Sequence, residues 1–125
     1  MMKRAEQDLK NLSASFFDDC GELRQVCFGL PQVTLHFEHM KIEVRNTCEI
    51  QDGEGKRWVW RAFEVSDMIG FGNLLGYTIR EFNVLPSAKL QLIFSNGRTL
   101  LLTADMTGYE CFIISKEGGY GDVIV

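Results

Sequence analysis

The side chains that could take part in metal binding or catalysis include two histidines and four cysteines. His36 and His39 lie three positions apart in a stretch where polar and apolar residues alternate. Residues three apart on a strand point to opposite faces, so this pair is poorly placed to share a metal ion. We expect both histidines at the surface and no metal site.

The cysteines are scattered, without the C-x-x-C spacing of a zinc or redox site. Cysteines without such spacing usually act as small buried hydrophobic residues in a reducing compartment. We therefore expect burial of Cys20, Cys27, Cys48 and Cys111. A hydrolase that uses Cys27 or Cys111 with a histidine is a minor alternative, because sequence gives no distances.

Acidic residues gather at two expected loop ends, in residues 18–22 and 49–54. The second group lies in an Asp-Gly-Glu-Gly turn, which offers only two carboxylates to a calcium ion and is typical of solvated turns. The alternative role is contact with a basic protein, whose approach acidic side chains would steer. The candidate contacts are Asp18, Asp19, Glu49, Asp52 and Glu54.

Two tryptophans raise a second possibility of partner binding. Trp58 and Trp60 are two apart, so on one strand they point to the same face. They either cap the core or form an exposed aromatic platform, and tryptophan is enriched among interface hot spots. Both interpretations stay open. The glycine-rich segments 70–72 and 118–121 lack the spacing of nucleotide-binding loops, so no cofactor is expected.

Length and composition set the frame for these side chains. The chain has 125 residues, 46% of them hydrophobic, which predicts a single domain over residues 1–125. Its net charge of −4 disfavours nucleic-acid binding, which usually needs a basic surface. No apolar stretch is long enough for a membrane span or a signal peptide, so we expect a cytoplasmic protein.

Hydrophobic periodicity predicts an α+β fold that is mostly β. We expect eight or nine mostly antiparallel strands and two short helices. The first helix should lie near the N-terminus. The second should begin at Ser66 and end at Gly76, with Met68, Ile69, Phe71, Leu74 and Leu75 as its apolar stripe. Asn96-Gly97 predicts a hairpin with a type I′ turn.

The two halves of the sequence resemble each other. Leu23 aligns with Ile79 at an offset of 56, and Phe37 aligns with Phe94 at an offset of 57. The sheet is thus expected to consist of two β-meander halves, at residues 20–64 and 76–125. An internal duplication explains this pattern, and so does the general likeness of any two meanders.

The second half also resembles a known group of proteins. Its features are Leu74-Leu-Gly76 followed by Ile79, then Lys89-Leu-Gln-Leu-Ile-Phe-Ser-Asn-Gly97, and then Tyr109-Glu110. This order is similar to an LLGxxI, LxLxFSNG, YES pattern in small bacterial proteins. The likeness covers residues 74–114, and the first meander fits more loosely. Cys111 stands where the pattern has serine.

Several proteins of that group are regarded as immunity proteins for toxins, including toxins of contact-dependent growth inhibition. The resemblance implies a non-enzymatic inhibitor that binds one cognate toxin, such as a nuclease, and occludes its active site. An acidic protein suits a basic nuclease. The alternative from another class is an interaction or scaffold domain without a toxin partner, for example a homodimer formed through sheet edges.

Overall fold

The computed structural model describes residues 8–64, 68–104, 111–117 and 122–125. It is mostly β and antiparallel with short helical segments, as the sequence predicts, but the strands form two sheets of five where one sheet was expected. The first sheet has the order β1 (Leu23–Phe28), β2 (Val33–Phe37), β3 (Met40–Val44), β9 (Phe112–Lys116), β10 (Asp122–Ile124). The second has the order β5 (Arg57–Arg61), β4 (Thr47–Gln51), β8 (Thr99–Thr103), β7 (Lys89–Phe94), β6 (Ile79–Leu85).

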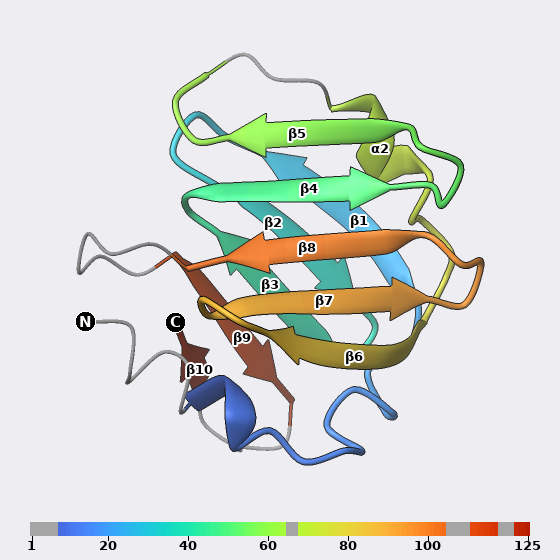
Figure 1. Cartoon of the computed structure of the whole chain (residues 1–125), viewed down its shortest axis with the longest axis vertical. Helices are drawn as coiled ribbons and strands as arrows, with labels where there is room; N and C mark the ends of the chain where they lie inside the picture. The colour runs from blue at the N-terminus through green and yellow to red at the C-terminus, as the bar shows by residue number, and fades with distance from the viewer. Residues whose placement is uncertain (1–7, 65–67, 105–110, 118–121) are drawn as a thin grey trace.

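Each sheet combines strands from both halves of the chain (Figure 1). The meander β1–β2–β3 forms three strands of the first sheet, but the hairpin β4–β5 that follows it pairs with β8 in the second. Reciprocally, the meander β6–β7–β8 lies in the second sheet, and the β9–β10 hairpin pairs with β3 in the first. The last two strands of each half therefore pair with the meander of the other half and not with their own.

The pairing register repeats between the halves. In β1–β2 the register shifts between Leu23 and Gln25, and in β6–β7 it shifts between Ile79 and Glu81, so both meanders carry an irregularity at the equivalent place. The rings of Phe37 and Phe94, which occupy equivalent positions, stack on each other at 6.1 Å. Two equivalent residues in mutual contact place a pseudo-twofold axis near this pair.

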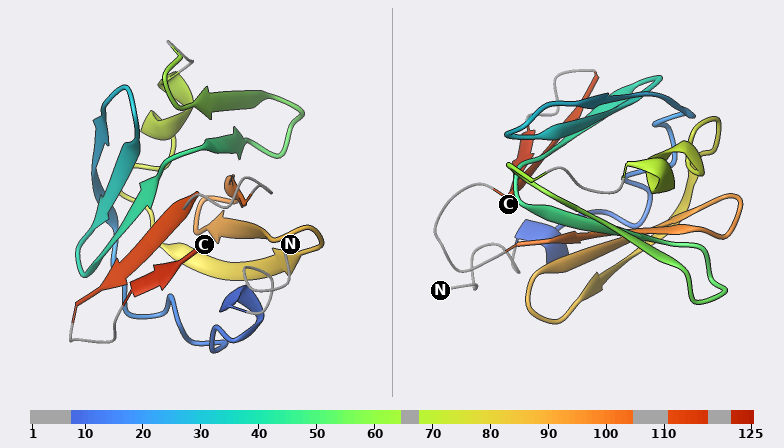
Figure 2. Two further views of the ribbon diagram at one scale, coloured as in Figure 1. Left: turned by 90° about the vertical axis from the view of Figure 1, so that its left-hand side faces the viewer. Right: turned by 90° about the horizontal axis from the view of Figure 1, so that it is seen from above.

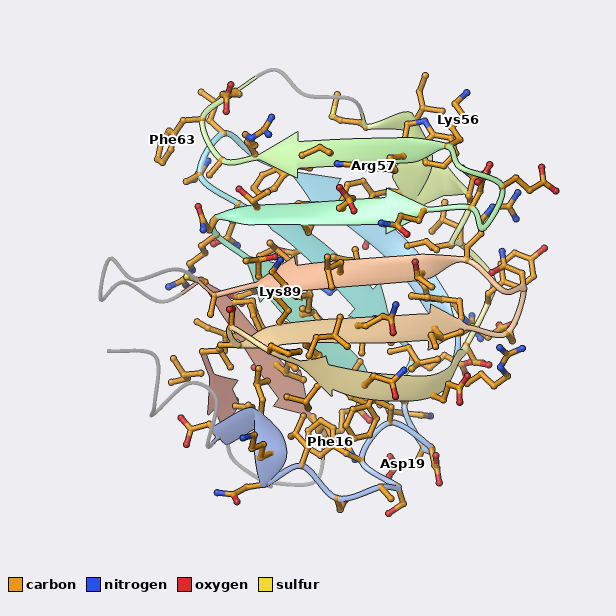
Figure 3. The ribbon with its side chains drawn as sticks, in the orientation of Figure 1. Phe16, Asp19, Lys56, Arg57, Phe63 and Lys89 are labelled. Atoms are coloured by element: carbon orange, nitrogen blue, oxygen red, sulfur yellow. The ribbon has the colours of Figure 1, made fainter. Side chains whose placement is uncertain are left out.

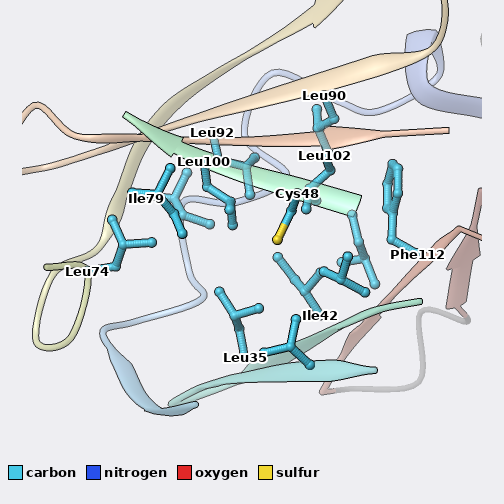
Figure 4. Close-up of a cluster of buried hydrophobic side chains, with 14 of the residues drawn as sticks. Leu35, Ile42, Cys48, Leu74, Ile79, Leu90, Leu92, Leu100, Leu102 and Phe112 are labelled. Atoms are coloured by element: carbon cyan, nitrogen blue, oxygen red, sulfur yellow. The ribbon is translucent and has the colours of Figure 1, made fainter. Parts of the chain in front are cut away.

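The core lies between the two sheets (Figure 4). Leu35 and Ile42 of the first sheet face side chains of the second, such as Leu92 and Leu100, and all four are fully buried. Alternation along the strands produces this core, since one face of each strand is apolar. Removing these side chains from water is the main source of stability.

Each end of the sandwich is closed by a segment that precedes a meander. The helix α2 (Ile69–Gly72) lies between the layers at the end formed by β1 and β5, as the right-hand view of Figure 2 shows. At the other end, residues 8–20 cover the core with Leu9 and Phe17, and the Phe17 ring contacts Phe82 of β6 at 5.1 Å. Both closing segments thus contact the half to which they do not belong.

Three local predictions need correction. The described residues contain ten strands, where eight or nine were expected. The hairpin at Asn96-Gly97 forms, but only Gly97 has a positive φ, so the turn is a type I turn ending in a left-handed glycine. The helix α2 has four residues and begins after Met68, because the glycines at 70 and 72 disfavour a longer helix, and the chain then turns at Gly76 (φ +85°) before β6. Ser66 lies outside the described residues.

Candidate protein-binding surface

Apolar side chains are exposed at the α2 end of the sandwich. We call this set the apolar patch, and it consists of Phe28, Leu30, Phe63, Met68 and Ile69. They come from the end of β1, the β1–β2 turn, the segment after β5 and the start of α2. Leu30, Phe63 and Ile69 are the most exposed, at 65%, 74% and 77%. Among the described residues, Ile124 of β10 is the one large hydrophobic side chain with comparable exposure outside this end and the α2–β6 connection.

A hydrogen bond between the two sheets positions two members of the patch. The backbone N–H of Phe63 donates to the carbonyl oxygen of Leu30 at 2.6 Å, which ties the β1–β2 turn to the end of β5. Phe63 adopts a left-handed backbone with φ +64°. Such a conformation is unfavourable for a residue with a side chain and is commonly kept where function needs it. Figure 3 shows Phe63 pointing away from the sheets at the end of β5 opposite Lys56.

The shortness of α2 explains why other patch residues remain in water. Phe71 is buried and its ring contacts Phe28 at 5.3 Å. Gly70 approaches β5 so closely that an added Cβ would lie 2.6 Å from the Cβ of Trp58. A four-residue helix held this tightly turns one face inward, so Met68 and Ile69 stay outside the core.

The tryptophans belong to the core, which confirms the first of the two interpretations and excludes the exposed aromatic platform that would have made them partner contacts. Trp58 and Trp60 are 7% and 3% exposed. They occupy the inward positions of β5, while Arg57 and Arg61 occupy the outward ones. The ammonium of Lys56 lies 5.1 Å from the centre of the Trp58 ring, at the edge of the core.

The acidic candidates lie at opposite ends of the sandwich. Asp18 and Asp19 belong to the segment that closes the β6 end, and Figure 3 shows Asp19 far from Arg57. Asp52 and Glu54 lie in the β4–β5 turn, three strands away from β6 in the sheet order. These carboxylates therefore do not form one contact surface.

Local hydrogen bonds and ion pairs occupy several of these acids. Glu49 pairs with Arg57 at 2.6 Å across the β4–β5 hairpin. Asp52 accepts hydrogen bonds from the backbone N–H groups of Glu54 and Lys56 through one carboxylate oxygen, which fixes the turn. These carboxylates have structural roles. Asp18 and Glu54 are exposed and remain predicted partner contacts.

A lysine of β9 holds the N-terminal closing segment. Lys116 donates to the carbonyl oxygen of Phe16 at 2.6 Å and pairs with Asp19 at 2.9 Å, while its ammonium lies over the Phe16 ring. The hydrogen bond from Lys116 holds the carboxyl pKa of Asp19 below its usual value. This polar contact fastens the end of the sandwich opposite α2.

The histidines and cysteines have separate surroundings. His39 is exposed and contacts Glu117 at 2.9 Å, and His36 is half-buried on the outer face of β2. Burial raises the pKa of the Cys20 thiol to about 11 and raises that of Cys48 further, so both are protonated at neutral pH. Cys111 is buried as expected, but Cys27 is exposed, because it points outward from β1.

Metal-binding clusters and membrane-spanning helices are both absent from the described residues. No group of three or more histidine, cysteine, aspartate or glutamate side chains there could hold a metal ion. No helix in those same ranges is long and apolar enough to cross a membrane.

A shallow hollow of about 310 Å³ lies on the outer face of the first sheet. It is lined by residues that include His36, Lys41, Ser115 and Glu117.

Comparison with known proteins provides no match. No model of a protein family fits the chain, and neither the curated proteins nor the solved structures include one that is similar to it. The likeness of residues 74–114 to immunity proteins therefore stays a prediction from the quoted sequence pattern.

Sequence reasoning missed the apolar patch. Met68, Ile69 and Leu75 were assigned to the apolar stripe of a longer helix, yet all three are exposed. One signal was available: the glycines at 70 and 72 disfavour a long helix, and a short helix cannot bury five apolar side chains. For Phe28, Leu30 and Phe63 the sequence offers no comparable signal.

Proposed function

We propose that this protein is a non-enzymatic binding domain whose apolar patch contacts a partner protein. The observation that carries the proposal is the exposure of Leu30, Phe63 and Ile69 at one end of an otherwise well-buried core. Large apolar side chains exposed along one edge of a soluble protein commonly mark an interaction site. The resemblance to immunity proteins supplies the partner class, a cognate toxin domain whose active site the protein covers.

The patch has the chemistry of interface anchors. Burial of apolar surface contributes about 25 cal/mol per Å², so several large side chains together contribute a few kcal/mol to association. A small number of such anchors usually dominates binding energy. Phe63 is held in place by its bond to Leu30, so part of the ordering cost is met before the partner arrives.

Charge supports a basic partner such as a nuclease. The net charge of −4 would raise the association rate with a basic toxin, an effect that salt weakens. Exposed acids such as Asp18 and Glu54 would act in this long-range attraction. Affinity in the bound complex would come from the apolar patch.

The test begins with the tagged full-length chain as bait in a lysate of its source bacterium. The recovered toxin domain is purified, and its activity is measured with and without this protein. We expect stoichiometric inhibition by the wild type. A double variant, Leu30→Ser with Ile69→Ser, should lose at least about tenfold in affinity, because it removes two anchors.

The matched control is Ile124→Ser, which removes an exposed apolar side chain at the other end of the sandwich. It should inhibit as the wild type does. Equal affinity of the double variant and the control would contradict the role of the patch. Recovery of only this protein with itself would instead favour the scaffold alternative, in which the patch mediates self-association.

A further inference from the structure

We infer that a second copy of this chain pairs with β1 in antiparallel register and joins the first sheets of two molecules into one. β1 is an outer strand of the first sheet, with a neighbouring strand, β2, on one side only. The open side of such a strand presents N–H and C=O groups that a further strand can bond. This pairing goes beyond the proposed function, because it requires no toxin.

The register of the β1–β2 hairpin determines which backbone groups are open. The N–H of Gly29 donates to the carbonyl oxygen of Gln32 at 2.9 Å, and hydrogen-bonded pairs then recur at every second residue. Cys27 therefore bonds with β2, while the N–H and C=O groups of Val26 and Phe28 point to the open side. No described residue forms a hydrogen bond with these four groups.

The other three outer strands are protected in ways that β1 is not. β10 has only three residues, and α2 packs against β5. Beside β6, Phe17 packs on Phe82, and Lys10 lines a hollow with residues of the same strand. Short length, covering segments and lysines are common protections against association. β1 has six residues without lysine or proline, and its Cys27 and Phe28 are exposed.

A second β1 is complementary to the first. When the twofold axis passes at Cys27, Val26 of each copy lies opposite Phe28 of the other, and all four open groups form hydrogen bonds. The Phe28 ring is positioned by its contact with Phe71 at 5.3 Å and is 42% exposed. Pairing would place this ring beside Val26 of the copy, which is a favourable apolar pair across strands.

The charges of β1 permit this approach. Arg24 is the one charged residue of the strand, and its guanidinium pairs with Glu22 at 3.4 Å and with Glu38 at 3.1 Å. It lies near the start of β1, so the two arginines of the dimer stand at opposite ends of the paired strands. Because one pair of short strands is a small interface, we expect a weak dimer whose population rises with concentration.

The first measurement is sedimentation equilibrium of the full-length protein in reducing buffer, over about a hundredfold range of concentration. Cys27→Ser should dimerise as the wild type does, because the backbone bonds remain. Cys27→Lys should weaken dimerisation at least about tenfold, because it places two ammonium groups opposite each other at the axis. Cys27 is exposed, so both variants should fold, and thermal unfolding of each checks this.

A second measurement tests the register through the native thiol. Directly opposed residues of a non-hydrogen-bonded pair have Cα atoms about 4.5 Å apart, a spacing that a disulfide accepts. Diamide, which takes up the two thiol hydrogens, should therefore convert the concentrated wild type into a covalent dimer through Cys27. The matched control is Gln25→Cys in a Cys27→Ser background, which moves the thiol to another exposed position of β1, away from the axis. It should give little covalent dimer.

The inference predicts a wild-type dimer that Cys27→Lys weakens, Cys27→Ser preserves and diamide links through Cys27. Monomers at every concentration would overturn it. A dimer that Cys27→Lys leaves unchanged would place the contact on another surface. Equal yields of covalent dimer from the wild type and from the Gln25→Cys control would contradict the register.

Discussion

The two ends of the sandwich are closed in different ways, although equivalent parts of the two halves close them. At the β6 end, residues 8–20 bury Leu9 and Phe17 and are fastened by the bonds of Lys116. At the β5 end, α2 and its flanking residues bury Phe71 and Leu74 but leave Met68 and Ile69 exposed. Residues 8–20 thus show that a segment can close an end of the sandwich without leaving large apolar side chains exposed to water. The exposed side chains at the β5 end are the ones that the proposed partner binding would use.

The largest expected effect concerns the end closed by α2, where Gly70 packs closely against Trp58. Gly70→Ala should lower the free energy of unfolding by about 2 kcal/mol, because its Cβ would meet the Cβ of Trp58 and force α2 away from β5. Gly72→Ala is the control, since nothing lies within 4 Å of its Cβ and alanine favours a helix. Urea denaturation measures both. Equal effects of the two variants would show that α2 does not press on Trp58.

The next largest effect concerns the opposite end, the fastened end, which residues 8–20 close and Lys116 holds. Lys116→Met should lower the free energy of unfolding by about 1–2 kcal/mol, because it leaves the Phe16 carbonyl oxygen and Asp19 without this donor. Hydrogen exchange should accelerate in residues 8–20 and stay unchanged in α2. Acceleration at α2 instead would mean that the two ends are not closed independently.

A third variant separates strain from binding. Phe63→Gly should raise the free energy of unfolding by about 1 kcal/mol, because glycine adopts φ +64° without a steric penalty. The same change should weaken partner binding, since it deletes an anchor of the apolar patch. Thermal unfolding and a binding titration are measured together. A variant that is less stable yet binds normally would reverse both expectations.

The smallest effect is the pH dependence of the fastened end. The carboxyl pKa of Asp19 is lowered, first by the Lys116 hydrogen bond, and that of Glu38 is lowered, first by the hydrogen bond from the Glu22 N–H. Carboxyls with lowered pKa values stabilise the fold above their unfolded pKa values, near 4, and this contribution is lost as the pH falls through the folded ones.

Asp19→Asn with Glu38→Gln should therefore flatten the loss of stability in acid. Denaturant titrations of the wild type and the double variant from pH 7 to pH 2 provide the comparison. An acid limb of unchanged slope would assign the loss of stability to other carboxyls.

Much of the fold follows from local pattern. Period-two alternation predicted the strands, and the offsets of 56 and 57 predicted which residues occupy equivalent places, including Phe37 and Phe94. The pairing of each hairpin with the other half was not predictable, because β4 has the same alternation whether it pairs with β3 or with β8. That choice depends on how the halves pack, which is a tertiary effect.

The candidate site was less predictable. The acids were chosen by charge, and Glu49 and Asp52 prove to be satisfied within the β4–β5 hairpin. The sequence leaves the tryptophans as either core residues or partner anchors, and the structure buries them. An apolar residue looks the same in sequence whether it fills the core or faces water, so exposure of Leu30 and Ile69 needed the structure.

The most direct test of the proposed binding surface is hydrogen exchange of the wild-type protein, free and in complex with the partner recovered from the lysate. If the apolar patch is the contact, residues 27–32 and 68–76 gain protection on binding, while residues 8–20 and 122–124 exchange as in the free protein. Protection confined to the fastened end would contradict the account and place the partner on the opposite side of the sandwich.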